Sequence, residues 1–324
     1  MPAPERVKMG NATPTITEKT CPDLKGNVYI VTGSNSGIGA LLAQILYDRH
    51  ATVYIAARSA LKAKAAIHDM KAKSPNSKGA LAFLKLDLND LSTIRSSAEE
   101  FLSKETRLDV LWNNAGVLTP PVGSESAQGY ELQLGVNCVG PFLFTKLLTP
   151  IMITTTKTAE KGSARVVWLA SQAAKLYAPE NGVDMSNLDN HLPRNENALY
   201  GASKAGNIFY GSEYARRFGK FGVISVSADP GNLKTDLYKH FPAWKRFVVN
   251  MILKEPIYGA YTELYAALSP DISLANNGAF IEPFGKIGEP RADVGKSLKL
   301  EAEGGSGIAA RFWDWTEKEV ASYV

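Results

Sequence analysis

Short apolar segments alternate with helical segments over most of this chain, and that alternation limits the fold more than any other feature. The apolar runs are β-branched and end in glycine or polar residues, whereas the segments between them repeat apolar residues every three or four positions. This order predicts a parallel sheet with helices on both faces, a doubly wound α/β fold. Ligands bind such sheets beyond the carboxyl ends of the strands. The predicted strands are 27–32, 52–57, 80–86, 108–112, 165–170, 223–228 and 277–281, and the predicted helices are 37–49, 59–73, 90–103, 126–149, 198–218 and 308–320.

A glycine-rich segment joins the first predicted strand to the first predicted helix. Glycines at 33, 37 and 39 let the backbone turn tightly and approach a diphosphate, whose charge then lies at the helix N-terminus. An ordinary tight turn could use the same residues, but the position between strand and helix favours a dinucleotide site in a Rossmann-type fold. The predicted cofactor-binding residues of this segment are Gly33, Ser34, Asn35, Ser36, Gly37, Ile38 and Gly39.

Arg58 follows the second predicted strand, where an acidic residue would bind a ribose 2′-hydroxyl. No Asp or Glu occurs between residues 52 and 66. A guanidinium at this point suits a 2′-phosphate through paired, charge-assisted hydrogen bonds. The sequence therefore predicts NADP(H) as the cofactor, with a solvated arginine as the alternative reading.

Tyr200 and Lys204 lie four residues apart on a predicted helix and so share one face. A free phenol has a pKa of about 10, which makes it a poor acid–base group at neutral pH. A fixed ammonium nearby favours the phenolate and brings proton transfer into working range. Ser171, at the end of the fifth predicted strand, could hydrogen-bond the same substrate oxygen. The motif occurs by chance in many chains, so its weight comes from the motifs around it.

Taken in order, these motifs resemble the short-chain dehydrogenase/reductase family. The resemblance runs from about residue 25 to 281 and rests on segments 32–39, 87–88, 113–116, 171, 200–204 and 230–231. It implies an oxidoreductase in which Ser171, Tyr200 and Lys204 are catalytic and Asn137 relays protons to Lys204 through water. It further implies cofactor contacts from Tyr200, Lys204, Asp87, Leu88, Asn114, Ala115, Gly116, Pro230, Gly231, Leu233 and Thr235.

A narrower resemblance to the retinol-dehydrogenase-like branch comes from residues 198–210 and 310–317. The chain departs from that branch at its N-terminus, which lacks the usual apolar anchor, and at residues 170–173, which replace a serine-rich run. Retinoid specificity is therefore not predicted. Soluble fungal-type reductases of specialised metabolism are similar in overall plan, and we prefer that broader assignment.

The predicted organisation is one domain, with an N-terminal arm at 1–26, the nucleotide-binding domain at 27–286 and a C-terminal extension at 287–324. Residues 232–252 have apolar and aromatic residues at helical spacing. They follow the nicotinamide-binding turn, where family members place a substrate lid, which suggests a bulky hydrophobic carbonyl or alcohol substrate. Packing on the core and contact with a membrane surface are the alternatives for this segment.

Composition excludes several other classes of protein. The net charge is +4 with scattered basic residues, which does not indicate a nucleic-acid partner. The four histidines and two cysteines show no metal-ligand spacing, so no metal is predicted. The polar N-terminus and the absence of a long apolar run favour a soluble, cytoplasmic protein. The family resemblance implies that the protein forms a homodimer or tetramer. The predicted helices at 126–149 and 198–218 would then pair between subunits.

Two other functions fit parts of the pattern. An NADP(H)-binding redox sensor or scaffold without turnover would use the same fold, but such proteins typically lose the tyrosine or the lysine, and this chain has both. A related epimerase or dehydratase shares the tyrosine pair, but its glycine loop usually has a different spacing and its substrate domain is longer. The leading hypothesis is thus an NADPH-dependent carbonyl reductase or the reverse alcohol dehydrogenase.

Overall fold

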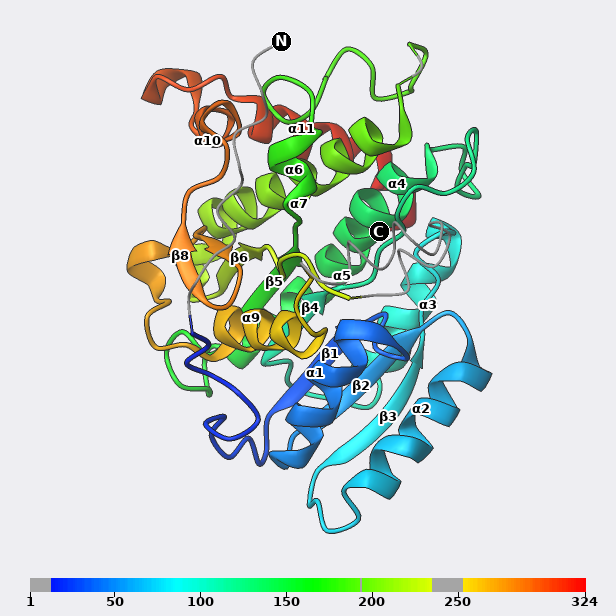
Figure 1. Ribbon diagram of the computed structural model, residues 1–324, viewed down its shortest axis with the longest axis vertical. Coiled ribbons are helices and arrows are strands. Elements are labelled where there is room, and N and C mark those ends of the chain that lie inside the picture. Colours follow the sequence, from blue (N-terminus) through cyan, green and yellow to red (C-terminus); the bar gives the residue numbers. More distant parts are fainter. Residues whose placement is uncertain (1–12, 193, 235–252) are drawn as a thin grey trace.

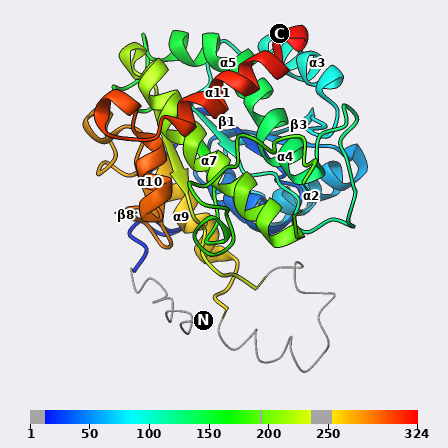
Figure 2. The ribbon, with the colours of Figure 1, turned by 90° about the horizontal axis from the view of Figure 1, so that it is seen from above.

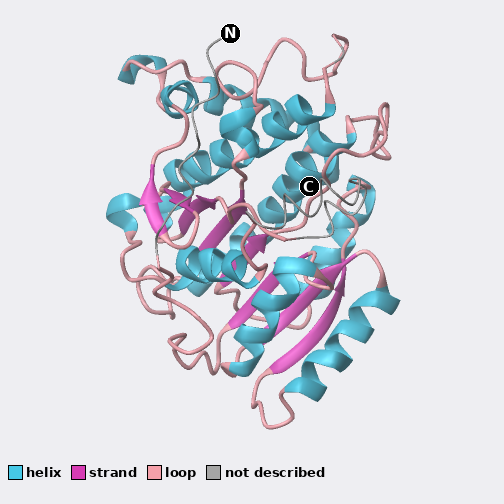
Figure 3. Ribbon diagram, viewed as in Figure 1, coloured by secondary structure: helices cyan, strands magenta, loops and turns pink. Residues whose placement is uncertain are grey.

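The computed structural model describes residues 13–192, 194–234 and 253–324. Their strands form an eight-stranded sheet in the order β3-β2-β1-β4-β5-β6-β7-β8. Neighbouring strands are parallel except for β7 and β8, which are antiparallel. Figure 1 and Figure 3 show this twisted sheet running through the middle of the molecule. The strands are β1 (Val28–Thr32), β2 (Thr52–Ala57), β3 (Ala80–Lys85), β4 (Val110–Asn113), β5 (Arg165–Leu169), β6 (Ile224–Ala228), β7 (Phe280–Glu282) and β8 (Lys286–Gly288).

Helices cover both faces of the sheet and bury one apolar core on each (Figure 2). The core on one face includes α1 (Gly37–Asp48), α2 (Ala60–Lys73) and α9 (Ile257–Leu268). The core on the other face includes α3 (Leu91–Leu102), α5 (Gly140–Thr155) and α7 (Glu196–Phe218). The central strands β1 and β5 are buried along their whole length and consist mostly of apolar residues, because both of their faces are covered. The doubly wound α/β fold predicted from the alternation is therefore confirmed.

Most predicted elements occur within two residues of their expected ends, because caps mark the ends in the sequence. Ser59, Asp90 and Asn195 each accept a backbone N–H in the first turn of the helix that follows them. The start of the helix predicted at 126–149 was wrong. It begins at α4 (Leu132–Leu134), passes through a π-helical turn at Gly135–Val139 and continues as α5 to Thr155. Residues before it form a turn in which Gly129 has φ +81°.

The C-terminal third was the least well predicted part of the chain. No helix or strand was predicted between residues 287 and 307, but they contain part of β8 and all of α10 (Ala292–Leu298). The expected domain boundary at 286 falls within β8, and α9 was not predicted at all. A tight turn at Phe284 and Gly285, both with positive φ, returns the chain along β7. The proposed division into arm, domain and extension stays a prediction, and the segment 235–252 lies outside the described residues.

The last helix, α11 (Ile308–Glu319), lies across α7 and α5 on one side of the sheet (Figure 2). Tyr210 of α7 and Thr316 of α11 share a hydrogen bond of 2.8 Å, and Lys146 of α5 pairs with Glu317. A dimer built through the outward faces of α5 and α7 would have to displace α11. Among the described residues one stretch, 132–155, is apolar and long enough to cross a bilayer, but 72% of its most apolar window is buried in the fold, as expected of a core helix.

Candidate active site

The carboxyl ends of β1, β4, β5 and β6 bring the predicted site residues to one edge of the sheet. The glycine segment leaves β1 there, residues 114–116 leave β4, Ser171 follows β5, and Pro230 follows β6. Tyr200 and Lys204 reach the same edge from α7, which packs on β5 and β6. Thr235 lies outside the described residues, so its expected contact stays a prediction.

The glycine segment has the backbone that a diphosphate loop requires. Gly33 and Gly37 have φ of +71° and +60°, a region that favours glycine. Among the described residues outside this local segment, no atom lies within 4 Å of the point where a Cβ of Gly37 would be, so the described part of the chain leaves this point open. The first turn of α1 has no acidic residue that would repel an anion. These residues therefore fit a nicotinamide dinucleotide, whose diphosphate would lie against the loop.

Close packing joins the glycine segment to the residues that follow β4. A Cβ on Gly39 would lie 2.5 Å from Nδ2 of Asn114, so only glycine fits there. That amide nitrogen donates to the Thr32 carbonyl at 2.6 Å, and the Ala115 N–H donates to the Thr32 hydroxyl at 2.9 Å. Thr32 was not among the predicted site residues, although its position at the end of β1 was visible in the sequence. It holds the glycine segment against residues 114–116, and both segments were expected to contact the cofactor.

The remaining predicted cofactor residues lie at strand ends around this centre. Arg58 is exposed beyond β2, and its guanidinium makes no hydrogen bond or ion pair within the described residues. Asp87 and Leu88 follow β3, and the Leu88 carbonyl packs so close to Gly140 that a Cβ there would lie 2.6 Å from it. Gly231 after β6 has φ +87°. These positions are those that the family resemblance implies, and the contacts themselves stay predictions.

Asn137 lies in the π-helical turn, buried beside α7. Its Oδ1 accepts from the Val117 N–H at 2.8 Å, and its Nδ2 donates to the Val117 carbonyl and the Ser203 hydroxyl, both at 3.0 Å. The π-turn interrupts the regular hydrogen-bond ladder of the helix, a feature often found at functional sites. The side chain is thus fixed on protein groups, with Gly116 between it and Lys204: a Cβ there would lie 3.0 Å from Oδ1 and 3.5 Å from Nζ.

Lys204 is fully buried, with its ammonium placed over the ring of Tyr200 at 5.6 Å from the centroid. Nζ donates to the Leu169 carbonyl at 2.8 Å, so the last residue of β5 holds the lysine in place. Burial lowers the pKa of Lys204 to about 8, because an uncharged amine loses less solvation. Ser171 lies two residues beyond Leu169, and its Oγ accepts from the Ala173 N–H at 3.2 Å. The structure therefore gathers Ser171, Tyr200 and Lys204 at the end of β5.

Two buried acids near Lys204 were missed by sequence reasoning. Asp229 lies directly before Pro230, and its carboxylate accepts from the Gly231 N–H at 2.9 Å. Burial raises the pKa of Asp229 to about 6. Glu263 of α9 is also fully buried, and both carboxylate oxygens lack a hydrogen-bond partner in the described part of the chain. Burial raises the pKa of Glu263 to about 8, so this side chain is mostly neutral at pH 7.

Replacing Glu263 with Gln should change how stability depends on pH. The folded pKa of Glu263 lies above the unfolded value of about 4.5, so the folded state holds the extra proton between these values. Its favourable contribution is complete below pH 4.5 and is lost as pH rises through 8. The glutamine variant has no proton to lose, so its free energy of unfolding should increase relative to wild type from pH 5 to pH 9. The gain should be on the order of several kcal/mol.

Melting temperatures of both proteins at pH 5, 7 and 9 measure this difference. Lys204 has a lowered pKa and contributes in the opposite direction above pH 8, but comparing the two proteins at each pH largely cancels that contribution. Glu99→Gln, at an exposed position of α3, is the matched control. Its melting temperature should depend on pH in the same way as that of wild type. A Glu263→Gln curve that is also parallel would show that this carboxyl is ionised in the folded protein.

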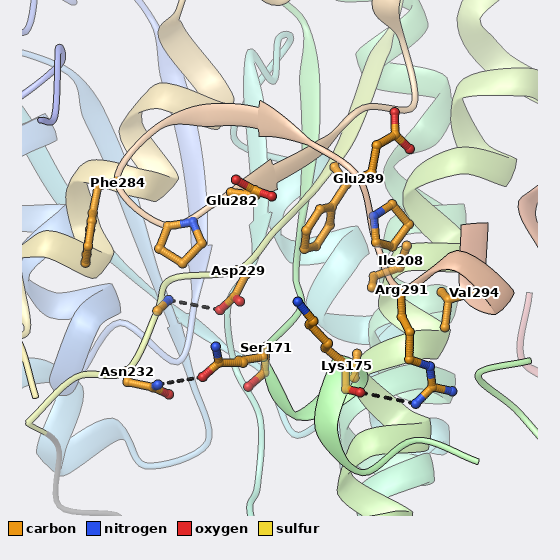
Figure 4. A pocket seen from close by; sticks show the side chains of 16 residues that line it. Ser171, Lys175, Ile208, Asp229, Asn232, Glu282, Phe284, Glu289, Arg291 and Val294 are labelled. Atoms are coloured by element: carbon orange, nitrogen blue, oxygen red, sulfur yellow. Dashed lines mark hydrogen bonds between the residues drawn. The ribbon is translucent and has the colours of Figure 1, made fainter. Parts of the chain in front are cut away.

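A pocket opens beside Ser171, on the side of β6 and β7 (Figure 4). Its walls come from the turn after β5, the turn after β6, the β7–β8 hairpin and the start of α10. Asn232 Nδ2 donates to Gln172 Oε1 at 2.5 Å, which ties the first two of these segments together. The described lining residues are Ser171, Gln172, Ala174, Lys175, Ile208, Asp229, Gly231, Asn232, Phe280, Glu282, Pro283, Phe284, Glu289, Pro290, Arg291 and Val294.

Comparison with known proteins gives consistent matches in family and in fold. The family model described as short chain dehydrogenase matches residues 27–246. A short-chain dehydrogenase/reductase of Phomopsis amygdali is 47% identical over 317 residues, covering 96% of this chain and 94% of the relative. Short-chain dehydrogenase/reductase pkfC of Emericella nidulans is 45% identical over 318 residues, with 97% and 99% covered.

Among solved structures, an uncharacterized protein from Mycobacterium paratuberculosis has a TM-score of 0.68 at 28% identity, covering 94% of this chain and 97% of that one. These matches bear on the family and on the fold. The narrower resemblance to the retinol-dehydrogenase-like branch is not shown by them and stays a prediction.

Proposed function

This chain belongs to the short-chain dehydrogenase/reductase family, and from that premise we propose that it is an NADPH-dependent carbonyl reductase, or the reverse alcohol dehydrogenase, with Tyr200 as its acid–base group. Members of the family are oxidoreductases that use NAD or NADP for hydride transfer. The observation that carries the finer proposal is the buried Lys204 ammonium over the Tyr200 ring, with Ser171 at the same strand end. When bound, the nicotinamide supplies or accepts the hydride.

The side chains at this site bind the reacting oxygen of the substrate and transfer a proton to or from it. Ser171 donates a hydrogen bond to the carbonyl oxygen and stabilises the charge that develops there. Tyr200 gives its phenolic proton to that oxygen during reduction and removes it during oxidation. Lys204 favours the deprotonated phenol by its charge, and the Leu169 carbonyl keeps its ammonium at this position. Proximity of these groups is already set by β5 and α7.

Proton supply to Lys204 is proposed to pass through Asn137. Its side chain is held by Val117 and Ser203, and the π-turn that contains Asn137 distorts the helix beside Lys204. A water molecule bound between Asn137 and Lys204 would carry protons between Lys204 and solvent while the substrate covers Tyr200. This role stays a proposal that the family resemblance suggested.

The preference for NADPH rests on Arg58. Its guanidinium is exposed and unpaired in the described residues, at the end of the strand that neighbours the glycine segment. Arg58→Ala should weaken NADPH binding by about 1.5–3 kcal/mol for each charge-assisted hydrogen bond lost, or roughly 10- to 150-fold in Kd. NADH binding should change little, because NADH lacks the 2′-phosphate. Titration of protein fluorescence with each cofactor measures both constants.

Lys73→Ala, which removes an exposed cation from the far end of α2, is the control for a general loss of positive charge. If Arg58→Ala weakened the binding of NADPH and NADH equally, Arg58 would not contact the 2′-phosphate. A wild-type protein that prefers NADH would contradict the cofactor proposal directly, while leaving the family assignment intact.

A carbonyl panel tests the proposed function as a whole. Purified protein should oxidise NADPH, followed by its absorbance, in the presence of at least one bulky aromatic or alicyclic ketone or aldehyde. The competing hypothesis, an NADP(H)-binding sensor or scaffold, expects tight cofactor binding and no turnover with any member of the panel. That outcome would refute the reductase proposal.

A further inference from the structure

Asp229 is a buried carboxylate where the two turns that carry the candidate site meet. It directly follows β6, and its side chain accepts from the Gly231 N–H at 2.9 Å, in the turn after β6. It also accepts from the backbone N–H of Gln172, the residue after Ser171 in the turn after β5. Figure 4 shows the first of these hydrogen bonds at the wall of the pocket, which Asp229 lines together with Ser171. One carboxylate thus joins both turns.

The two backbone N–H groups hold the Asp229 carboxylate but do not neutralise its charge. In the described part of the chain Asp229 makes no ion pair. Lys204 of α7 attracts the carboxylate from a distance and Glu282 of β7 repels it. The Lys204 ammonium itself donates to the Leu169 carbonyl. Burial raises the pKa of Asp229 to about 6, so at pH 7 the side chain is mostly ionised. The site therefore contains a buried negative charge.

The nicotinamide ring of a bound cofactor is expected to lie close to this carboxylate. Hydride passes directly between the ring and the carbonyl carbon, whose oxygen Ser171 and Tyr200 are proposed to bind. Asp229 accepts from the N–H next to Ser171 and lines the same pocket. The oxidised ring carries one positive charge and the reduced ring is neutral. The two redox states of the cofactor thus differ by a unit charge beside Asp229.

We propose that Asp229 selects the redox state of the cofactor by favouring the oxidised nicotinamide over the reduced one. This inference rests on the cofactor site of the proposed function, but not on turnover. Opposite unit charges within about 10 Å of each other change a binding constant by at least about tenfold where the effective dielectric constant is about 20. Asp229 would also favour carbonyl reduction, in which the ring gains a positive charge as its hydride leaves.

Binding of NADP⁺ and NADPH, measured by titration of protein fluorescence at pH 7, tests the proposal without any substrate. Asp229→Asn keeps the size of the side chain and one acceptor oxygen but removes the charge. It should lower the ratio of the NADPH Kd to the NADP⁺ Kd at least about tenfold. A loss of order in the turns alone would weaken both forms alike, and an unchanged ratio would overturn the proposal. Glu99→Gln, which removes a negative charge from an exposed position of α3, should keep the wild-type ratio.

Wild type supplies a second test should Asp229→Asn fail to fold. Between pH 5 and pH 7 Asp229 loses its proton, whereas Lys204 stays mostly charged and Glu263 mostly neutral, because burial sets the pKa of each at about 8. The wild-type ratio should therefore rise several-fold over this range, and that of folded Asp229→Asn should not. A constant wild-type ratio would refute the role of Asp229. A protein that binds NAD(H) instead is tested by the same ratio with NAD⁺ and NADH, so failure of the NADPH preference, or of turnover, is distinguished from failure of this inference.

Discussion

Replacing Tyr200 with Phe is expected to lower the turnover of every accepted carbonyl by about 100- to 10,000-fold, the usual contribution of a positioned acid–base group. The substitution removes only the hydroxyl, so the ring stays under the Lys204 ammonium and the packing of α7 is kept. NADPH should still bind, because the glycine segment, Asn114 and Lys204 are unchanged. The prediction therefore separates proton transfer from cofactor binding.

Initial rates with saturating NADPH and a fluorescence titration of the cofactor, carried out on the same preparation, measure the two effects. Tyr323→Phe, near the C-terminus, removes a phenol remote from the site and should retain full activity. Turnover by Tyr200→Phe within tenfold of wild type would assign the proton to another group. Loss of cofactor binding would show instead that the hydroxyl mainly positions NADPH.

The edge of the sheet that carries the candidate site could be predicted because most of its residues follow directly after strands. Gly33, Ser171 and Pro230 each follow an apolar run that reads as a strand, and parallel strands bring their carboxyl ends to one edge. The shared face of Tyr200 and Lys204 follows from helical spacing alone, but their assignment to the site came from the motifs around them. Strand ends and helical spacing can be recognised from a few neighbouring residues. Predicting them therefore requires no knowledge of contacts between distant parts of the chain.

The buried acids could not be predicted, since their state depends on distant segments. No element was predicted around Glu263, but α9 packs against β5 and β6 and removes its carboxyl from water. Asp229 becomes a buried acceptor only after the turn at Gly231 has formed. The same limit applies to the pocket beside Ser171, whose lining includes Lys175 and Glu289, which are 114 positions apart in the sequence.

The C-terminal helix illustrates a third case, in which the helix was predicted and its partners were not. Periodicity identified 308–320, but not that this helix lies on α5 and α7. Thr316 is fully buried against Tyr210, and Phe312 stacks on the same ring at 5.2 Å. The helix that carries Tyr200 and Lys204 is thus supported from behind by a segment more than a hundred residues later in the chain.

Replacing Trp313 with Ala is expected to lower the free energy of unfolding by about 3–5 kcal/mol, the usual cost of removing a buried aromatic side chain. Trp313 is only 4% exposed. Its ring packs edge-on against Phe142 of α5 at 4.7 Å and lies 5.0 Å below the Arg217 guanidinium of α7. Alanine leaves a cavity that two packed helices cannot collapse to fill. Urea unfolding followed by circular dichroism measures the loss.

Lys318→Ala provides the matched control, because it shortens an exposed side chain on the same helix and should change stability by less than about 0.5 kcal/mol. Folded Trp313→Ala should also lose turnover as temperature rises before wild type does, since α11 supports the helix that holds Lys204 against the Leu169 carbonyl. A loss below about 1 kcal/mol would mean that α11 is only loosely packed. In that case the outward faces of α5 and α7 would be available for pairing with a second subunit.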